Sequence, residues 1–219
     1  MTPVLGPGWN LMGNSLDTVI DVAAMFGSAA SAVPGVTEKV ETIWKWDALN
    51  RQWAYYAPGL TMTQLETFAG DHGYEILATI NPGEGYWVEA LGDVVLAGQT
   101  APTFTFDRAT YSSLPRGWNL VAMGSTSAPS PHEFATAVSE SAPPQQAVNE
   151  DSFDSLWAWD ARQQKWYFYS PLLENLPCNA SPCGITAVRD FARNKGYLHF
   201  EDSGRTLDPG TGFWVSKTY

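Results

Sequence analysis

The chain has 219 residues, of which 44% are hydrophobic and 13% aromatic, so it can build one or two domains with a buried core. Its 23 acidic and 12 basic side chains leave a net charge of −11, which repels phosphate backbones and anionic membranes and argues against nucleic-acid binding. No apolar run approaches the roughly 20 residues of a membrane-spanning helix, so the sequence also argues against membrane insertion.

The predicted elements begin with a strand over residues 9–12. Apolar residues then recur at helical spacing between Leu16 and Phe26, which predicts a short helix with Ser15 as its N-cap. A loop rich in Ala, Ser and Pro follows at residues 28–35. The chain therefore reaches its first aromatic segment after one strand and one helix.

A β-hairpin is predicted next, because alternating large residues flank a polar connection at residues 49–52. A second helix carries its apolar residues on one face and ends at Gly73. Two strands, over residues 76–80 and 86–90, close this half of the chain.

The second half of the chain repeats the first. The tetrapeptide Gly-Trp-Asn-Leu occurs at residues 8–11 and 117–120, and a Trp-X-Trp-Asp motif and a Pro-Gly-X-Gly-aromatic-Trp-Val motif each occur once in both halves. All ten tryptophans fall into five equivalent pairs, which are Trp9 and Trp118, Trp44 and Trp157, Trp46 and Trp159, Trp53 and Trp166, and Trp87 and Trp214. We therefore interpret the sequence as an internal duplication.

The same elements are predicted in the second copy. In chain order they are a strand over 118–123, a helix that begins with a capping box at Ser130–Glu133, a loop at 139–148, an aromatic hairpin, a helix that ends at Gly196, and strands over 198–201 and 213–217.

Residues 92–113 connect the two copies. Their stretch at 93–98 has no counterpart in the second copy, so we expect an extra strand that joins the modules. The sequence predicts an α+β fold in which two homologous modules, each a mainly antiparallel sheet with short helices, pack as a pseudo-twofold duplication. The first module would span residues 1–98 and the second residues 99–219.

The combination of GWNL, WxWD and PGxGFWV resembles a repeat module of large secreted or surface-anchored bacterial proteins. Both halves match, although Tyr86 stands where the pattern usually has Phe, and Asp208 and Thr211 stand where Asn and Glu are usual. The resemblance implies an extracellular, non-catalytic accessory or surface module, and no catalytic residues come with it.

The tryptophans of the hairpins are the candidate ligand-binding residues. Trp44 and Trp46 would project from one face of a strand, and such an aromatic slab can stack on sugar rings. A short module also needs large side chains to fill its core, so we expect most of the tryptophans to be buried. The residues that we expect to be exposed at the far ends of the hairpins are Trp53 with Tyr55 and Trp166 with Phe168.

The acidic residues indicate structure more than catalysis. Asp47 and Asp160 stand at the starts of the hairpin turns, where an Asp accepts hydrogen bonds from nearby backbone N–H groups. A glycosidase needs two carboxylates roughly 5 to 9.5 Å apart, but the other acids hardly repeat, and Glu84 becomes Thr211. The three histidines lie in no nucleophile or zinc motif. We therefore predict that the chain is not an enzyme and holds no cofactor or metal.

Both cysteines lie in one short loop, where two prolines hold Cys178 and Cys183 close enough for a disulfide. Two reduced thiols are the alternative. A disulfide implies an oxidising compartment and, with the resemblance, predicts an extracellular or cell-surface location. The first residues lack the basic and apolar regions of a signal peptide, so an exported chain would have had its signal removed.

Three functions follow as hypotheses. The leading one is a non-catalytic extracellular binding or adhesion module, with carbohydrate or another surface protein as its partner. The second is a structural subunit of a bacterial surface layer or extracellular filament, which would self-associate. The third and least favoured is a polysaccharide hydrolase with a cleft lined by unpaired acids.

Overall fold

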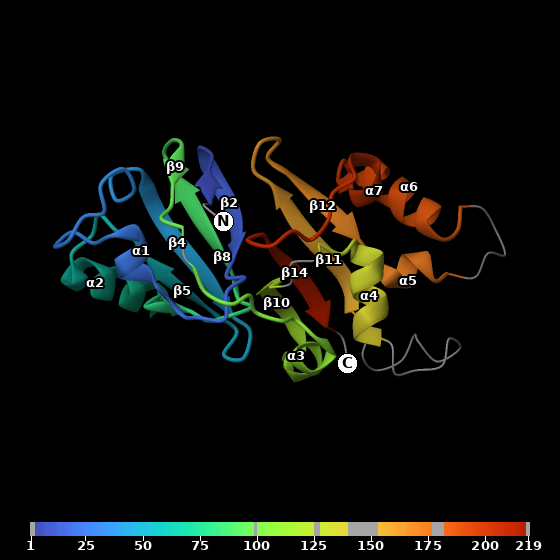
Figure 1. The fold of residues 1–219 in the computed structure, drawn as a ribbon, viewed down its shortest axis with the longest axis horizontal. Coiled ribbons are helices and arrows are strands. Elements are labelled where there is room, and N and C mark those ends of the chain that lie inside the picture. Colours follow the sequence, from blue (N-terminus) through green and yellow to red (C-terminus); the bar gives the residue numbers. More distant parts are fainter. Residues whose placement is uncertain (1–2, 99, 125–127, 140–152, 177–181, 218–219) are drawn as a thin grey trace.

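The computed structural model describes residues 3–98, 100–124, 128–139, 153–176 and 182–217. Two five-stranded sheets form the framework, one in each half of the chain (Figure 1). The first has the order β2 (Gly8–Gly13), β8 (Gly85–Ala90), β4 (Val40–Asp47), β5 (Gln52–Tyr56) and β6 (Glu75–Ile76). The second repeats it with β10 (Gly117–Ala122), β14 (Gly212–Lys217), β11 (Phe153–Asp160), β12 (Lys165–Tyr169) and β13 (Leu198–His199). The predicted α+β class with two similar sheet modules is confirmed.

Both sheets are antiparallel except at one edge. There β6 runs parallel to β5, and β13 runs parallel to β12. A hairpin can join antiparallel neighbours, whereas a parallel neighbour requires a crossover. The crossovers are the helices α2 (Met62–His72) and α6 (Ile185–Lys195), which carry the chain back before the edge strand begins. The aromatic hairpins predicted in both halves are β4–β5 and β11–β12.

Several helix signals in the sequence are confirmed. α2 and α6 end at Gly73 and Gly196, both in the left-handed conformation. α4 (Pro131–Ser139) begins with the predicted capping box, in which Ser130 N donates to the Glu133 carboxylate and Glu133 N donates to Ser130 Oγ. The remaining helices are α1 (Val22–Phe26), α3 (Arg108–Ser113), α5 (Pro171–Glu174) and α7 (Phe200–Ser203).

The helix predicted after the first strand is shorter than expected. It is limited to α1, and its N-cap is Asp21, whose carboxylate accepts a hydrogen bond from Ala24 N at 2.9 Å. The residues before it form the short strand β3 (Ile20–Asp21), which pairs with β7 (Thr79–Ile80). The prediction that Ser15 caps this helix is therefore wrong.

Three strand predictions also need correction. The extra strand is β9 (Val94–Val95), but it pairs with β1 (Val4–Leu5) inside the first module and does not join the two modules. The strand expected over 76–80 is divided into β6 and β7, which pair with different partners. The strand expected over 198–201 ends early because α7 begins at Phe200.

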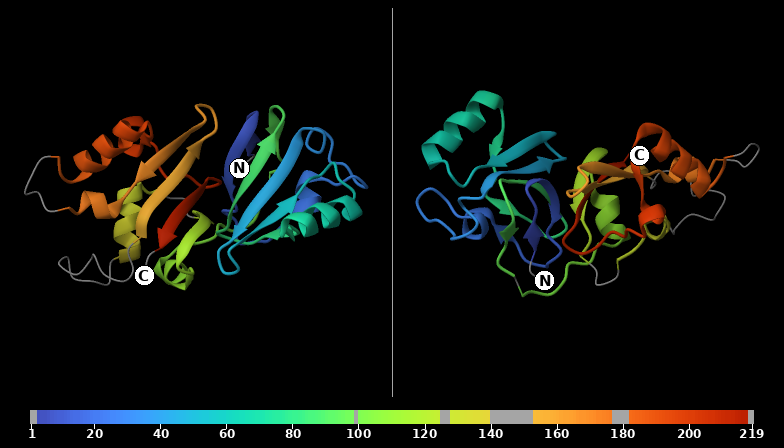
Figure 2. Two further views of the ribbon diagram at one scale, coloured as in Figure 1. Left: turned by 180° about the vertical axis from the view of Figure 1, so that it is seen from behind. Right: turned by 90° about the horizontal axis from the view of Figure 1, so that it is seen from above.

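Two separate buried clusters fill the modules, one within residues 5–96 and the other within residues 106–215. α1 packs Phe26 against Tyr86 of the first sheet, and α4 packs Phe134 against Phe213 of the second. Helices α1 and α2 of the first module and α4 to α7 of the second lie toward opposite ends of the molecule, and the two sheets meet in its middle (Figures 1 and 2). All ten tryptophans are described, and none is among the buried residues of either core.

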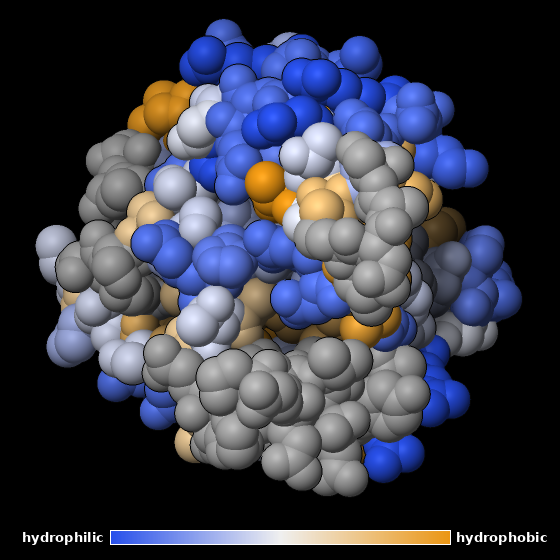
Figure 3. Space-filling view, turned by 90° about the vertical axis from the view of Figure 1, so that its right-hand side faces the viewer, coloured by the Kyte–Doolittle hydropathy of each residue, from blue (hydrophilic) through white to orange (hydrophobic). Residues whose placement is uncertain are grey.

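The outer end of the second module has a largely hydrophilic surface on which hydrophobic residues are scattered (Figure 3). Among the described residues, no helix combines the length and the apolar character that a membrane crossing requires. The aromatic surface of the protein is concentrated instead where the two sheets meet.

Candidate ligand-binding groove

The tryptophans lie on one face of each sheet. In the first sheet Trp44 is paired with Trp87 on one side and with Tyr55 on the other, so the three side chains point to the same face. In the second sheet Trp157 has the equivalent place between Trp214 and Phe168. The alternate residues of these strands enter the cores, which leaves each tryptophan face toward the other module.

The two tryptophan faces contact one another through reciprocal ring pairs. Trp87 of the first module contacts two tryptophans of the second, and the equivalent Trp214 contacts the two equivalent tryptophans of the first. The ring-centroid distances are 5.9 Å for Trp87–Trp159, 5.7 Å for Trp87–Trp166, 6.4 Å for Trp214–Trp46 and 5.9 Å for Trp214–Trp53. The two sets of contacts are therefore equivalent and are related by the same rotation that relates the two modules.

The hydrogen bonds between the modules also join equivalent positions. Trp46 Nε1 donates to Trp118 O, and Trp159 Nε1 donates to Trp9 O, both at 2.9 Å. The backbone adds a further pair, in which Gly13 N donates to Gly210 O at 2.9 Å and Ala122 N donates to Gly83 O at 2.8 Å. Because these bonds lie at equivalent places, the modules pack with near-twofold symmetry.

The Pro-Gly-X-Gly motifs determine how closely the modules approach. The first glycine of each motif, Gly83 or Gly210, has positive φ and forms the turn. A Cβ at the second glycine would lie 2.9 Å from Val121 O in the case of Gly85, and 2.3 Å from Met12 O in the case of Gly212. The second glycine of each motif therefore serves the contact between the modules.

One contact between the modules has no counterpart. The buried Ser15 donates its hydroxyl to Met123 O and accepts a hydrogen bond from Gly210 N at 2.6 Å. The equivalent position in the second module is Gly124, where a Cβ would lie 1.8 Å from Phe104 O. Ser15 therefore joins the modules on one side only.

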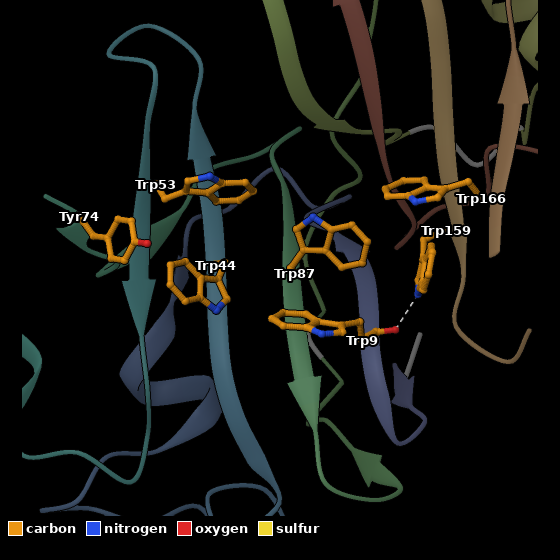
Figure 4. A pocket seen from close by; sticks show the side chains of 7 residues that line it. All are labelled: Trp9, Trp44, Trp53, Tyr74, Trp87, Trp159 and Trp166. Atoms are coloured by element: carbon orange, nitrogen blue, oxygen red, sulfur yellow. Dashed lines mark hydrogen bonds between the residues drawn. The ribbon is translucent and has the colours of Figure 1, made fainter. Parts of the chain in front are cut away.

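Two pockets, of about 360 and 610 Å³, remain between the tryptophan faces. The first is lined by Trp9, Trp44, Trp53, Tyr74, Trp87, Trp159 and Trp166 (Figure 4). The second is lined by Trp46, Trp53, Trp87, Trp118, Trp157, Trp166, Tyr197 and Trp214. All of these residues are aromatic, and they include every tryptophan of the chain. The pockets share Trp53, Trp87 and Trp166, so we treat them as one tryptophan groove with two subsites.

The rings of the first subsite are set at steep angles. Figure 4 shows Trp44 and Trp53 across a gap from Trp9 and Trp87, with residues of the second module beyond Trp87. The interplanar angle is 89° between Trp44 and Trp53 and 87° between Trp9 and Trp87. The subsite therefore presents aromatic walls in more than one direction.

The four predicted binding residues separate into two groups. Trp53 and Trp166 are partly exposed and line both subsites, whereas Tyr55 and Phe168 are only 5% and 4% exposed. The expectation that Tyr55 and Phe168 are exposed is therefore wrong: α2 and α6 cover them with Phe68 and Phe191, at ring-centroid distances of 4.6 and 4.9 Å.

The expectation that most tryptophans are buried is also wrong. Each one retains exposed surface, and Trp118 is 46% exposed. Sequence reasoning found their pairing but missed the site that they form together. The period-two alternation in the hairpins places their tryptophans on one face and Ile43, Ala54, Leu156 and Tyr167 on the other, but it does not indicate that the tryptophan faces of the two modules meet.

The two paired aspartates stabilise the hairpin turns, as predicted. The Asp47 carboxylate accepts hydrogen bonds from Asn50 N and Leu49 N at 3.0 and 2.9 Å, and the bond from Asn50 is the main cause that lowers the pKa of Asp47. Burial alone would raise the pKa of Asp160, but hydrogen bonds from Gln163 N and Arg162 N and the charge of Arg205 lower it.

The predicted disulfide involves Cys178, which lies outside the described residues, so its pairing with Cys183 stays a prediction. The loop expected at 139–148 lies almost wholly outside them as well. Within the described ranges, no group of three or more His, Cys, Asp or Glu side chains is arranged to hold a metal ion.

No protein-family model, curated protein or solved structure matches the chain.

Proposed function

We propose that this protein is a non-catalytic extracellular binding module, and that the tryptophan groove holds a carbohydrate. The observation that carries the proposal is that all ten tryptophans line one groove and remain at least partly exposed, while the fully buried positions of both cores are filled by other side chains. An apolar aromatic surface that remains in contact with water is characteristic of an interaction site.

Carbohydrate is the ligand class that we favour. A pyranose ring has an apolar C–H face that packs flat on an indole. Indole N–H and tyrosine hydroxyl groups can also form hydrogen bonds with the ring oxygen and hydroxyl oxygens of the sugar. Rings at steep angles would contact the face and the edge of one sugar together. Two subsites that share Trp53, Trp87 and Trp166 suit a ligand with at least two sugar units.

The proposal is tested by acrylamide quenching of tryptophan fluorescence with a panel of soluble polysaccharides, namely β-glucan, xylan, mannan and pectin. We expect at least one to protect the tryptophans. Trp53→Ala and Trp166→Ala should weaken that binding about 5- to 10-fold, because each removes a stacking ring shared by both subsites. Leu49→Ala, at an 80% exposed site in a hairpin turn, is the matched control and should bind normally.

Circular dichroism and thermal melting establish that each variant is folded. Binding that Trp53→Ala and Trp166→Ala leave unchanged would place the ligand outside the groove and contradict the proposal. Quenching that no polysaccharide alters would contradict carbohydrate as the ligand class.

A structural subunit that self-associates is the second candidate, and one observation favours it. Val4 and Val95 are direct partners in the β1–β9 ladder and are 64% and 61% exposed. Exposed apolar side chains on short edge strands offer a surface for another copy. Sedimentation velocity over a tenfold concentration range, with Val95→Thr as the variant, tests it: association that this variant abolishes supports the structural role, and a monomer throughout contradicts it.

A further inference from the structure

The two subsites of the tryptophan groove differ in the charge of the residue paired with one lining tryptophan. Trp9, which lines the first subsite, is paired with Glu89 in the β2–β8 ladder, and Trp118, which lines the second, is paired with Ser216 in the β10–β14 ladder. Directly paired residues of a sheet have Cβ atoms about 5 Å apart and point to the same face. Glu89 therefore places a carboxylate beside the Trp9 end of the first subsite.

The Glu89 side chain is held in place on that face. Its Oε2 accepts a hydrogen bond from Thr42 Oγ1 at 3.1 Å, and Thr42 is its partner on the neighbouring strand β4. Among the described residues no Lys, Arg or His forms an ion pair with it. Lys45 is paired with Glu84 at 2.8 Å, and Lys39 donates to Asp93 O. The carboxylate of Glu89 thus remains available to a cation that enters the first subsite.

The charge of the surrounding module favours such a cation. Residues 1–98 carry eleven acidic and three basic side chains, whereas residues 99–219 carry twelve and nine. Most of the net charge of −11 therefore belongs to the module that supplies Glu89. This field raises the local concentration of cations and lowers that of anions.

The aromatic walls select the kind of cation. A cation is attracted to the face of each ring it approaches, and tryptophan is the strongest partner of this kind. Walls at 89° and 87° to one another suit a compact rounded group that contacts several faces. A quaternary ammonium group has this shape, and its methyl groups also pack against indole, whereas a bare ammonium would lose its hydration.

We propose that the first subsite, with Glu89 at its edge, binds a quaternary ammonium group. The second subsite has the equivalent rings but Ser216 in place of the carboxylate, so it binds the same group more weakly. This inference rests on the proposed binding role of the groove and adds a charged group to the ligand. Choline is the small-molecule source of that group and a trimethyllysine peptide the protein-borne source.

The experiment titrates choline and its neutral carbon isostere 3,3-dimethylbutan-1-ol into the full chain and follows tryptophan fluorescence at low salt. We expect choline to bind at least tenfold more tightly than the isostere, and its affinity to fall as salt screens the charge. A titration with the trimethyllysine peptide identifies the source, since tighter binding than that of choline assigns the group to a peptide and weaker binding to a small molecule.

Two pairs of variants locate the cation. Trp9→Leu should weaken choline binding about tenfold, and the matched Trp118→Leu should weaken it less, because the second subsite contributes less of the binding. Glu89→Ser should weaken choline about 3- to 10-fold without changing binding of the isostere. The second module already carries serine at this place, so Glu89→Ser should fold normally, and Ser216→Glu should strengthen choline binding.

The outcomes separate this inference from the proposed function. Equal binding of choline and the isostere, or a Glu89→Ser variant that binds choline normally, overturns the cation subsite even if a polysaccharide still protects the tryptophans. If no polysaccharide protects the tryptophans but choline still binds, and Trp9→Leu weakens that binding about tenfold, the cation subsite is retained and carbohydrate is overturned as the ligand class.

Discussion

Replacing Ser15 by alanine tests whether the contact between modules stabilises the whole chain. Ser15 is 8% exposed, and its hydroxyl bonds both Met123 O and Gly210 N of the second module. Ser15→Ala leaves both backbone groups without this partner, and a buried polar group that loses its hydrogen bond costs about 1 to 3 kcal/mol. We therefore expect the free energy of unfolding to fall by about 2 to 4 kcal/mol.

Urea unfolding followed by circular dichroism measures this change, provided that the slope with urea is unchanged. Ser113→Ala, at an exposed serine of α3, is the control and should lie within about 0.5 kcal/mol of the parent. Because Gly210 forms the turn before β14, the variant should also increase acrylamide quenching of the groove tryptophans. A Ser15→Ala variant as stable as the control would refute the assignment of Ser15 to the module interface.

Two further predictions concern buried ionisable groups of the second module. The pKa of His199 is lowered mainly by burial and further by the charges of Arg189 and Arg193, whereas Asp202 and Glu201 act in the opposite direction. As pH falls, the unfolded state therefore takes up the proton before the folded state does. The free energy of unfolding should therefore fall as pH decreases below about 6.5. His199→Ile, which introduces the residue found at the equivalent position Ile76, should remove this pH dependence. Urea midpoints measured from pH 8 to pH 5 check both expectations. Lys217 Nζ donates to the carbonyl oxygens of Tyr111, Ser112 and Leu114 at 3.2, 2.9 and 3.0 Å. Lys217→Met should thus lower the free energy of unfolding by about 2 to 3 kcal/mol and increase amide exchange in α3, whereas Lys165→Met at an exposed site should not.

Local signals in the sequence predicted most of the secondary structure. The glycines at the ends of α2 and α6, the capping box of α4 and the alternation in both hairpins depend on neighbouring residues, so they can be interpreted without the tertiary fold. The helix predicted over residues 16–26 is shorter than expected because long-range contacts determine its first half. β3 pairs with the distant strand β7, and this long-range pairing overrides the helical spacing of the first apolar residues.

The candidate site was only partly predictable for the same reason. Alternation placed the tryptophans of each hairpin on one face of a strand, but it does not reveal which face of a sheet is covered and by what. Tyr55 and Phe168 share the tryptophan face, yet α2 and α6 cover them. The subsites depend on ring pairs such as Trp87–Trp166, which come from different modules and have no signature within either repeat.

The groove is a property of the pair of modules, and it uses the tryptophans that stand at the same positions in both modules. In a single module, Trp46 would lose the carbonyl of Trp118 as the acceptor for its Nε1, and Trp87 would lose the rings of Trp159 and Trp166. Its tryptophan face would then be a broad apolar surface in water, which favours unspecific association. Packing two such faces covers part of that surface, and the glycines at 85 and 212 let the backbones approach. The rings that remain uncovered are those that line the two subsites, so the same residues hold the modules together and leave aromatic walls open to a ligand.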